Sequence, residues 1–287
     1  MHDEKRMSVG NALKAFFMLL LSAPVISRFF GRVVALKHPR KLVAFVIRRF
    51  IRMYGIDTTE VEKTVADYPS LSAFFIRRLK SGARPVGNDP SVIVSPVDGL
   101  VMTAGILTNS LEALQIKGKS YSLEKLVPEG MDLSAYRGGQ FMQLYLSPRD
   151  YHRIHFPFDS RVIQSTYRKG RLLPVNHFSL SHFKNVFPEN ERVILELEHS
   201  SHTVLMVLVG ALNVGRIGLS FSDFETNRRP RKDCEIQLTQ DHGEKGNELG
   251  WFMMGSTVVL FFPENVFDPE IDSDSTVRVG QPIGRWT

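Results

Sequence analysis

Cysteine is nearly absent from this 287-residue chain, which contains only Cys234. A single thiol excludes an internal disulfide framework and a zinc site built from several cysteines. We therefore expect the protein to belong to a reducing compartment.

The sequence also lacks a long hydrophobic run near its basic N-terminus. The apolar segment at residues 12–23 is too short to span a bilayer, and Pro24 interrupts it. Lys5 and Arg6 precede it as they would precede a secretory signal, but no small-x-small cleavage site follows. A cleaved signal peptide is therefore the weaker interpretation.

Several catalytic signatures are missing as well. There is no Walker A loop, and Gly210, Gly215 and Gly218 do not fit the dinucleotide-binding fingerprint. Ser256 lies in Gly-Ser-Thr rather than in the Gly-x-Ser-x-Gly elbow of α/β hydrolases. No repeat of fixed period and no low-complexity tract is present.

Positive charge is concentrated in the N-terminal third. Residues 1–85 hold 16 Lys and Arg against 6 Asp and Glu, a net charge of +10, whereas residues 86–287 carry 20 against 24, a net of −4. A basic appendage on a slightly acidic body indicates a polyanionic surface as partner, either nucleic acid or anionic lipid.

Two segments of this basic region are amphipathic. Apolar residues recur at helical spacing over residues 25–34, and again over residues 42–51, where the pattern ends at Tyr54-Gly55. They could be ordinary helices with solvated arginines. Wide apolar faces beside arginines favour helices that lie in the plane of a membrane, and they argue against nucleic acid, because phosphate binding does not need them.

A third helix is expected within residues 68–86, capped by Ser70 or Ser72 and ending near Gly82. We place a boundary here, between a helical membrane-associating region at residues 1–85 and a β-rich catalytic domain at residues 86–287.

From residue 91 onward the sequence consists of short β-rich runs separated by turn residues, with no regular alternation of helices. This pattern predicts an α+β protein with a predominantly antiparallel, sandwich- or barrel-like β body and an N-terminal basic amphipathic helical region. The expected strands are residues 91–94, 100–104, 141–146, 161–167, 192–198, 203–209, 234–238 and 257–262.

Three stretches carry candidate chemistry. Asp98 precedes a glycine, His152 and His155 share a polar aromatic segment, and Ser256 opens an apolar strand. Each has a plain alternative, namely an Asp-Gly turn, partly buried histidines and a glycine turn. Together they supply an acid, a base and a hydroxyl, the components of a nucleophilic triad.

A metal site is the competing interpretation of the histidines. His199 and His202 repeat the three-residue spacing of His152 and His155, but no His-Glu-x-x-His motif is present. We therefore expect no metal.

The combination of motifs resembles the phosphatidylserine decarboxylase family of pyruvoyl-dependent enzymes, in its bacterial membrane-associated form. The match extends from about residue 65 to about residue 262, and its most specific parts are the run from Ser147 to His155 and Gly255-Ser256-Thr257. One departure is Met254, where leucine is expected and the volume is similar. The residues that carry the resemblance are Tyr68-Pro69, Phe74-Phe75, Arg77, Arg84-Pro85, Pro96 to Gly99, Gln115 to Gly118, Leu146 to His155, Val175-Asn176, Asn190 to Arg192 and Met254 to Thr257.

The resemblance implies a proenzyme that cleaves itself. By this analogy His155 accepts the proton of Ser256, Asp98 holds His155 and stabilises its charge, and the Ser256 hydroxyl attacks the Gly255 carbonyl. Cleavage would give a large chain, residues 1–255, and a small chain, residues 256–287, whose first residue becomes a pyruvoyl group.

The resemblance also implies the reaction and its setting. The pyruvoyl group forms a Schiff base with phosphatidylserine, which is decarboxylated to phosphatidylethanolamine, with His152 as the candidate proton donor and His155 as the alternative. We expect a peripheral protein on the cytoplasmic face of the cell membrane, a substrate in an anionic leaflet, a homodimer and no nucleic-acid partner.

Two other functions fit the same features. One is a membrane-associated serine hydrolase that uses Asp98, His155 and Ser256 without self-cleavage. The other is a basic, membrane-bound β scaffold without catalytic activity.

Overall fold

A computed structural model describes residues 33–116, 119–175, 177–183, 185–211, 216–227, 232–253 and 255–287. The apolar run at residues 12–23 and nearly all of the predicted amphipathic segment at residues 25–34 lie outside these ranges, as does Met254.

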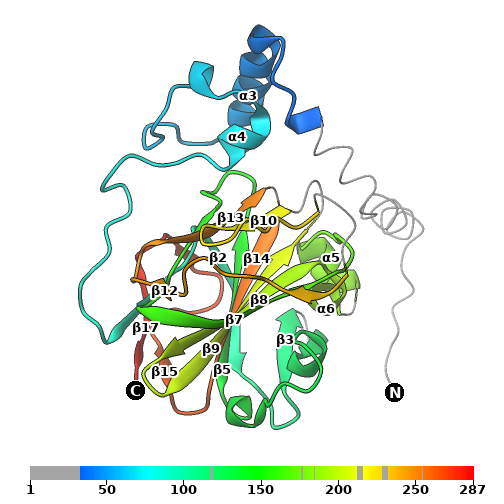
Figure 1. The fold of residues 1–287 in the computed structure, drawn as a ribbon, viewed down its shortest axis with the longest axis vertical. Helices are drawn as coiled ribbons and strands as arrows, with labels where there is room; N and C mark the ends of the chain where they lie inside the picture. The colour runs from blue at the N-terminus through cyan, green and yellow to red at the C-terminus, as the bar shows by residue number, and fades with distance from the viewer. Residues whose placement is uncertain are drawn as a thin grey trace.

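The centre of the protein is a nine-stranded sheet in which every pair of neighbours is antiparallel (Figure 1). The predicted antiparallel β body is therefore confirmed. β12 (His242–Gly243) pairs with β7 beside the main path. That path is β11 (Cys234–Glu235), β7 (Ser160–Arg168), β8 (Arg192–His199), β9 (His202–Gly210), β14 (Ser256–Phe262), β5 (Gln140–Leu146), β2 (Gly99–Ile106) and β16 (Thr276–Val277).

Three smaller sheets complete the β body. They are β10 (Arg216–Leu219), β13 (Glu248–Met253) and β6 (Arg153–His155); β1 (Val92–Val94), β17 (Pro282–Trp286) and β15 (Phe267–Pro269); and the hairpin β3 (Glu112–Ile116) and β4 (Lys119–Ser122). The expected strand at 234–238 is shorter than predicted, because its pairing with β7 covers only Cys234 and Glu235.

Strand β14 lies in the middle of the core, and all seven of its residues are buried. Alternate side chains of a strand point to opposite faces. Val258 and its face-mates pack with Ile154 and Phe252 of the β6–β13 layer. Val259 and Phe261 pack on the other face, against a second cluster that includes residues of the short helices α5 (His177–His182) and α6 (Val186–Glu189) and of the 3-10 turns η2 (Leu123–Lys125) and η3 (Ser134–Tyr136). Both faces of the central strand are therefore covered.

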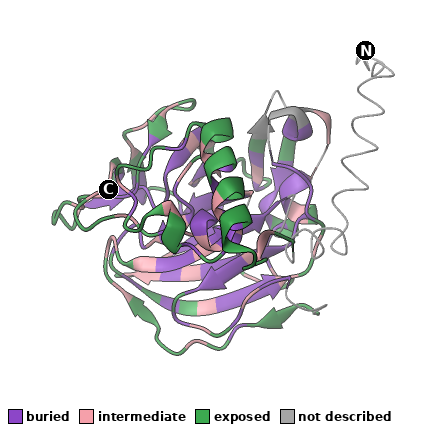
Figure 2. Ribbon diagram, turned by 90° about the horizontal axis from the view of Figure 1, so that it is seen from above, coloured by how far each residue is buried: buried purple, intermediate pink, exposed green. Residues whose placement is uncertain are grey.

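The helix α3 (Arg40–Tyr54) stands at one end of the molecule (Figure 1). Gly55 ends it in the left-handed conformation, with φ 62°, as the sequence predicted. Its buried face is narrower than expected and consists of Val43, Ile47 and Phe50. Seen from that end, the helix is largely exposed (Figure 2). Leu42 and Val46, which belong to the apolar pattern predicted over residues 42–51, remain at the surface.

The next helix is shorter than the sequence suggested. Ser70 caps α4 (Leu71–Phe75) by accepting a hydrogen bond from the Ala73 amide, but the helix ends at Phe75 rather than near Gly82. The chain beyond it pairs instead with residues 60–62: Glu62 N donates to Arg78 O at 3.0 Å, and Lys80 N donates to Glu60 O at 2.8 Å. Another 3-10 turn, η1 (Val65–Asp67), precedes α4.

The helices have their own apolar cluster, formed by residues between 43 and 75. The boundary at residue 85 stays a prediction. Among the described residues, no helix has the length and apolar character needed to cross a membrane.

Candidate active site

Ser256 is the first residue of the central strand β14. It lies opposite Leu146 of β5 and Gly210 of β9, on the face that packs against the β6–β13 layer. The side chain is fully buried, and its Oγ has no hydrogen-bond partner among the described residues. Leaving a buried hydroxyl unpaired costs about 1–3 kcal/mol. Such a group needs a reason, and a reactive role provides one.

The residue before this serine has an unusual backbone. Gly255 adopts φ 48°, in the left-handed region that glycine enters without the steric penalty of a side chain. The chain passes there from β13, which ends at Met253, to β14 in the neighbouring layer. The peptide bond predicted to be cut therefore lies at a sharp change of direction, next to a buried hydroxyl.

His155 ends strand β6 and lies beside the segment that carries Asp98. Its amide donates to Pro96 O at 2.8 Å, and Val94 N donates to Pro157 O at 3.0 Å. Both ring nitrogens are occupied: Nδ1 is 2.6 Å from Gly246 O and Nε2 is 3.1 Å from the Tyr151 hydroxyl. Because a carbonyl can only accept, Nδ1 carries the proton and Nε2 accepts from Tyr151.

The environment of His155 keeps the ring neutral. Burial lowers the pKa of His155 below its ordinary value, while the Gly246 carbonyl and the charges of Glu248 and Asp98 act in the opposite direction. A neutral imidazole with its lone pair on Nε2 is the form that a general base requires.

Asp98 lies immediately before β2, and its carboxylate is bound by a neighbouring arginine. Arg84 donates from Nε to Oδ1 at 2.9 Å and from Nη2 to Oδ2 at 2.5 Å, and Val279 N donates to Oδ1 at 2.8 Å. The following residue must be glycine, because a Cβ on Gly99 would lie 2.4 Å from Tyr145 O. No hydrogen bond joins Asp98 to His155 in the described part of the chain.

The structure thus places Asp98 and Ser256 at the same end of the central sheet and His155 beside the segment that carries Asp98, and no hydrogen bond joins any two of the three side chains among the described residues. Ser256 faces Leu146, and β2 lies on the other side of β5, so the Cα atoms of Ser256 and Gly99 are about 10 Å apart across two strand spacings.

His152, the second candidate histidine, is fully buried just before β6. Its Nδ1 is 2.9 Å from Asp150 O, and its Nε2 has no partner among the described residues. Burial lowers the pKa of His152 to about 3, so the ring is neutral and Nε2 is a bare proton acceptor. The ring of Phe75 lies against it, with centroids 4.1 Å apart.

The other histidine pair is remote from Ser256. His199 and His202 face each other where β8 and β9 meet, at the opposite end of β9 from Gly210, which lies beside Ser256. Eight strand residues separate the two ends by about 26 Å. Among the described residues, no group of three or more His, Cys, Asp or Glu side chains is arranged to hold a metal ion.

Several residues around the site had no assigned role in the sequence. Arg84 and Tyr151 belong to motifs that carry the family resemblance, but only the fold shows that one binds Asp98 and the other His155. Gly246, whose carbonyl orients His155, gave no sequence signal, because a backbone acceptor can be supplied by any residue type.

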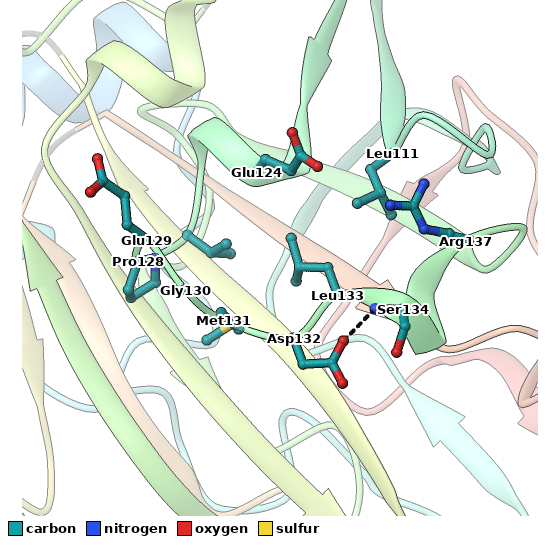
Figure 3. A pocket seen from close by; sticks show the side chains of 11 residues that line it. Leu111, Glu124, Pro128, Glu129, Gly130, Met131, Asp132, Leu133, Ser134 and Arg137 are labelled. Atoms are coloured by element: carbon teal, nitrogen blue, oxygen red, sulfur yellow. Dashed lines mark hydrogen bonds between the residues drawn. The ribbon is translucent and has the colours of Figure 1, made fainter.

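Two cavities differ in their relation to this site. A cavity of about 280 Å³ is lined by Asp98, Tyr151, Arg77 and Arg84 among others. A second, of about 400 Å³, lies around η2 and η3, where Asp132 accepts a hydrogen bond from the Ser134 amide (Figure 3). It contains none of the candidate catalytic residues, whereas the first is lined by Asp98, so of these two cavities only the first adjoins the site.

Comparison with known proteins points to one family. The family model described as phosphatidylserine decarboxylase matches residues 71–285. A phosphatidylserine decarboxylase proenzyme of Brevibacillus brevis is 36% identical over 280 residues, covering 96% of this chain and 98% of that protein. Proteins with the same name from Nitrosococcus oceani and Bacillus subtilis are 39% and 38% identical, covering 85% and 83% of this chain and 82% and 85% of their own lengths.

Proposed function

Because the chain belongs to the phosphatidylserine decarboxylase family, we propose that it is a proenzyme that cleaves itself between Gly255 and Ser256 and then converts phosphatidylserine to phosphatidylethanolamine. The observation that carries the self-cleavage is the buried, unpartnered Ser256 hydroxyl directly after a glycine in the left-handed conformation. An ordinary hydrolase would need its serine accessible to an external substrate, and Ser256 is fully buried.

The first step is a transfer within the chain. His155 Nε2, once released from the Tyr151 hydroxyl, takes the proton of Ser256 Oγ, and Oγ attacks the Gly255 carbonyl carbon. The peptide C–N bond breaks, the proton passes to the Ser256 nitrogen, and an ester links the two residues. β-Elimination then removes the Cα proton of residue 256 to a base and breaks its Cβ–O bond, which frees the Gly255 carboxylate and leaves dehydroalanine. This residue tautomerises to an imine, and water replaces the nitrogen with oxygen, releasing ammonia and leaving a pyruvoyl group.

Asp98 assists His155 by its charge in this proposal. Protonation of Nε2 makes the ring positive, and a nearby carboxylate stabilises that form. In the uncleaved chain the Asp98 carboxylate is hydrogen-bonded to Arg84. Asp98 must therefore give up a bond to Arg84 before its carboxylate can contact His155 directly.

The residues present fit a pyruvoyl group at position 256, since the atom that would be transformed is a buried polar atom with no other task. Once formed, the group would supply an electrophilic ketone, able to bind the substrate amine covalently and to accept the electron pair left by carbon dioxide. His152 is the candidate to move protons: its buried Nε2, without a partner among the described residues, would take one from the substrate ammonium and return it to the carbon that has lost carbon dioxide.

We also propose that α3 holds the protein on the cytoplasmic face of the cell membrane, where the substrate lies in an anionic leaflet. Leu42, Phe45 and Met53 are 54%, 61% and 58% exposed, and Arg48 and Arg49 are exposed beside them. An interfacial helix binds by inserting apolar side chains into the lipid and by attracting anionic headgroups with basic side chains. Each basic residue near the membrane surface contributes about 1 kcal/mol of binding free energy. The homodimer implied by the resemblance is also a proposal.

The test is a time course on denaturing gels, with a decarboxylation assay on phosphatidylserine vesicles. Wild-type protein should split into chains of residues 1–255 and 256–287 and release carbon dioxide, whereas Ser256→Ala should do neither. Ser165→Ala removes another buried hydroxyl without a hydrogen-bond partner in the described structure, and it should behave as wild type. Lipid hydrolysis by an uncleaved chain would favour the serine hydrolase instead.

A further inference from the structure

The chain between α4 and the β body contacts the loop that holds His152. We call residues 33–85 the helical unit and residues 147–152 the His152 loop. Arg77 donates from Nη2 to the carbonyls of Arg149 and Asp150, both at 2.9 Å, and Phe75 packs on the His152 ring. Two residues of the helical unit therefore reach a candidate catalytic residue.

Arg77 acts on the carbonyl that sets the state of His152. Asp150 O accepts from Arg77 Nη2 and from His152 Nδ1, each at 2.9 Å. A charged donor on the far side of this oxygen fixes its position. Arg77 is only 4% exposed, and its guanidinium lies 5.2 Å from the Phe74 ring, so it is itself held in place. Through Asp150 O, Arg77 thus favours the tautomer with the proton on Nδ1.

Phe75 acts on the imidazole directly. Phe75 and His152 are both fully buried, and the tilted ring contact places an apolar side chain where water would otherwise solvate the imidazole. On the side of the β body, His152 O accepts from the amide of Phe252, another buried aromatic. Nε2 is therefore buried and has no protein partner in the described structure.

We propose that Phe75 and Arg77 are positioning residues for decarboxylation, which hold the His152 ring neutral, with Nδ1 protonated and Nε2 bare. The inference rests on the proposed function and extends it: the helical unit completes the catalytic site in addition to binding the membrane. Neither residue touches the reacting atoms, so both act through His152.

The charged groups around His152 give the expected direction of a pH effect. Arg77 faces it from the segment after α4, Arg149 and Asp150 belong to its own loop, and its neighbour on β13, Phe252, is uncharged. Burial is the main cause of the lowered pKa, opposed by the Asp150 carbonyl and reinforced by the charge of Arg77. A smaller side chain at position 75 that admits water should raise the pKa of His152. Because the proposed role needs a neutral ring, decarboxylation activity should then begin to fall at a higher pH when the solution is acidified.

The kinetic test compares Phe75→Leu with Phe50→Leu. Phe50 belongs to the same apolar cluster, with its ring centroid 6.0 Å from that of Phe75, and has no ring contact with His152 in the described structure. Both variants should cleave themselves. We expect kcat for decarboxylation to fall about tenfold or more in Phe75→Leu, with KM nearly unchanged, since general acid–base groups contribute about 10²–10⁴-fold. Equal kcat values in the two variants would refute the positioning role.

The second test does not depend on decarboxylation. In the uncleaved Ser256→Ala protein, the titration of His152 is followed by ¹⁵N NMR and assigned with His152→Gln. Adding Phe75→Leu should raise the pKa of His152 by at least about one unit, adding Arg77→Met should alter its tautomer signal, and adding Phe50→Leu should leave both unchanged. An identical titration in all of these variants overturns the inference. Loss of decarboxylation by the wild-type protein, with the NMR differences intact, would refute the proposed function alone.

Discussion

The β body and the helical unit bury their apolar residues to different extents. Strand β14 has every residue buried between two layers, whereas α3 buries three side chains and exposes Leu42, Phe45 and Met53. Buried apolar area stabilises a fold, and an exposed apolar face indicates a partner surface. The difference teaches that the core around β14 is closed on both faces and holds an unpaired Ser256, while α3 leaves an apolar face exposed among the described residues, as the proposed membrane contact requires.

His155→Ala should have the largest effect. Without a base at this position the Ser256 proton has no acceptor, and we expect self-cleavage to slow by at least about a thousandfold. The appearance of the two chains on denaturing gels measures this. His199→Ala removes a histidine at the far end of the sheet and should cleave normally; cleavage at the wild-type rate in both variants would remove His155 from the reaction.

His152→Gln should separate the two activities. The variant should cleave at close to the wild-type rate, because His152 has no part in the attack on Gly255, but decarboxylate about a hundredfold more slowly. Single-turnover release of carbon dioxide from fully cleaved protein is the measurement. Full turnover would transfer the proton-carrying role to His155.

Gly99→Ala should weaken the β body itself. The new Cβ would lie 2.4 Å from Tyr145 O, and we expect the free energy of unfolding to fall by about 2 kcal/mol, within the range for overpacking. Denaturant titration of the uncleaved Ser256→Ala protein measures it. Gly87→Ala is the matched control, since its Cβ would have nothing within 4 Å. Equal stability of the two variants would contradict the close approach of β2 and β5.

Phe45→Ser should affect only the outer surface of the helical unit. Losing one exposed aromatic should weaken binding to anionic vesicles about tenfold, equivalent to roughly 1.4 kcal/mol, with self-cleavage unchanged. Vesicle co-sedimentation gives the ratio. Ile163→Ser, at an exposed position of β7, is the control and should bind as wild type. If both variants bind equally well, α3 is not the membrane-facing element.

The sequence predicted the strands that have a strong local hydrophobic pattern. It missed short strands that are recognisable only from their backbone pairing with a neighbouring strand. Alternating runs such as residues 192–198 became β8, but the three-residue strand β6 is recognisable only because β13 lies beside it. The end of α4 was predicted too late, since the backbone pairing with residues 60–62 joins segments that local periodicity cannot relate.

The candidate site also contains features that the sequence predicted and features that it did not. The residue types of Asp98, His155 and Ser256 indicated chemistry, and the fold places Asp98 and Ser256 at the same end of the central sheet, while the joint role of the three residues stays a prediction. Their partners in the uncleaved chain could not be predicted, because Arg84 and the Gly246 carbonyl come from distant segments and bind through geometry that only the folded chain creates.

Intact-mass analysis of the purified wild-type protein tests the central claim most directly. Self-cleavage predicts two chains, residues 1–255 and 256–287, with the smaller one lighter by one ammonia than its sequence requires and blocked at its N-terminus. A single chain of 287 residues with unmodified Ser256, in a preparation that releases carbon dioxide from phosphatidylserine, would contradict the proposal.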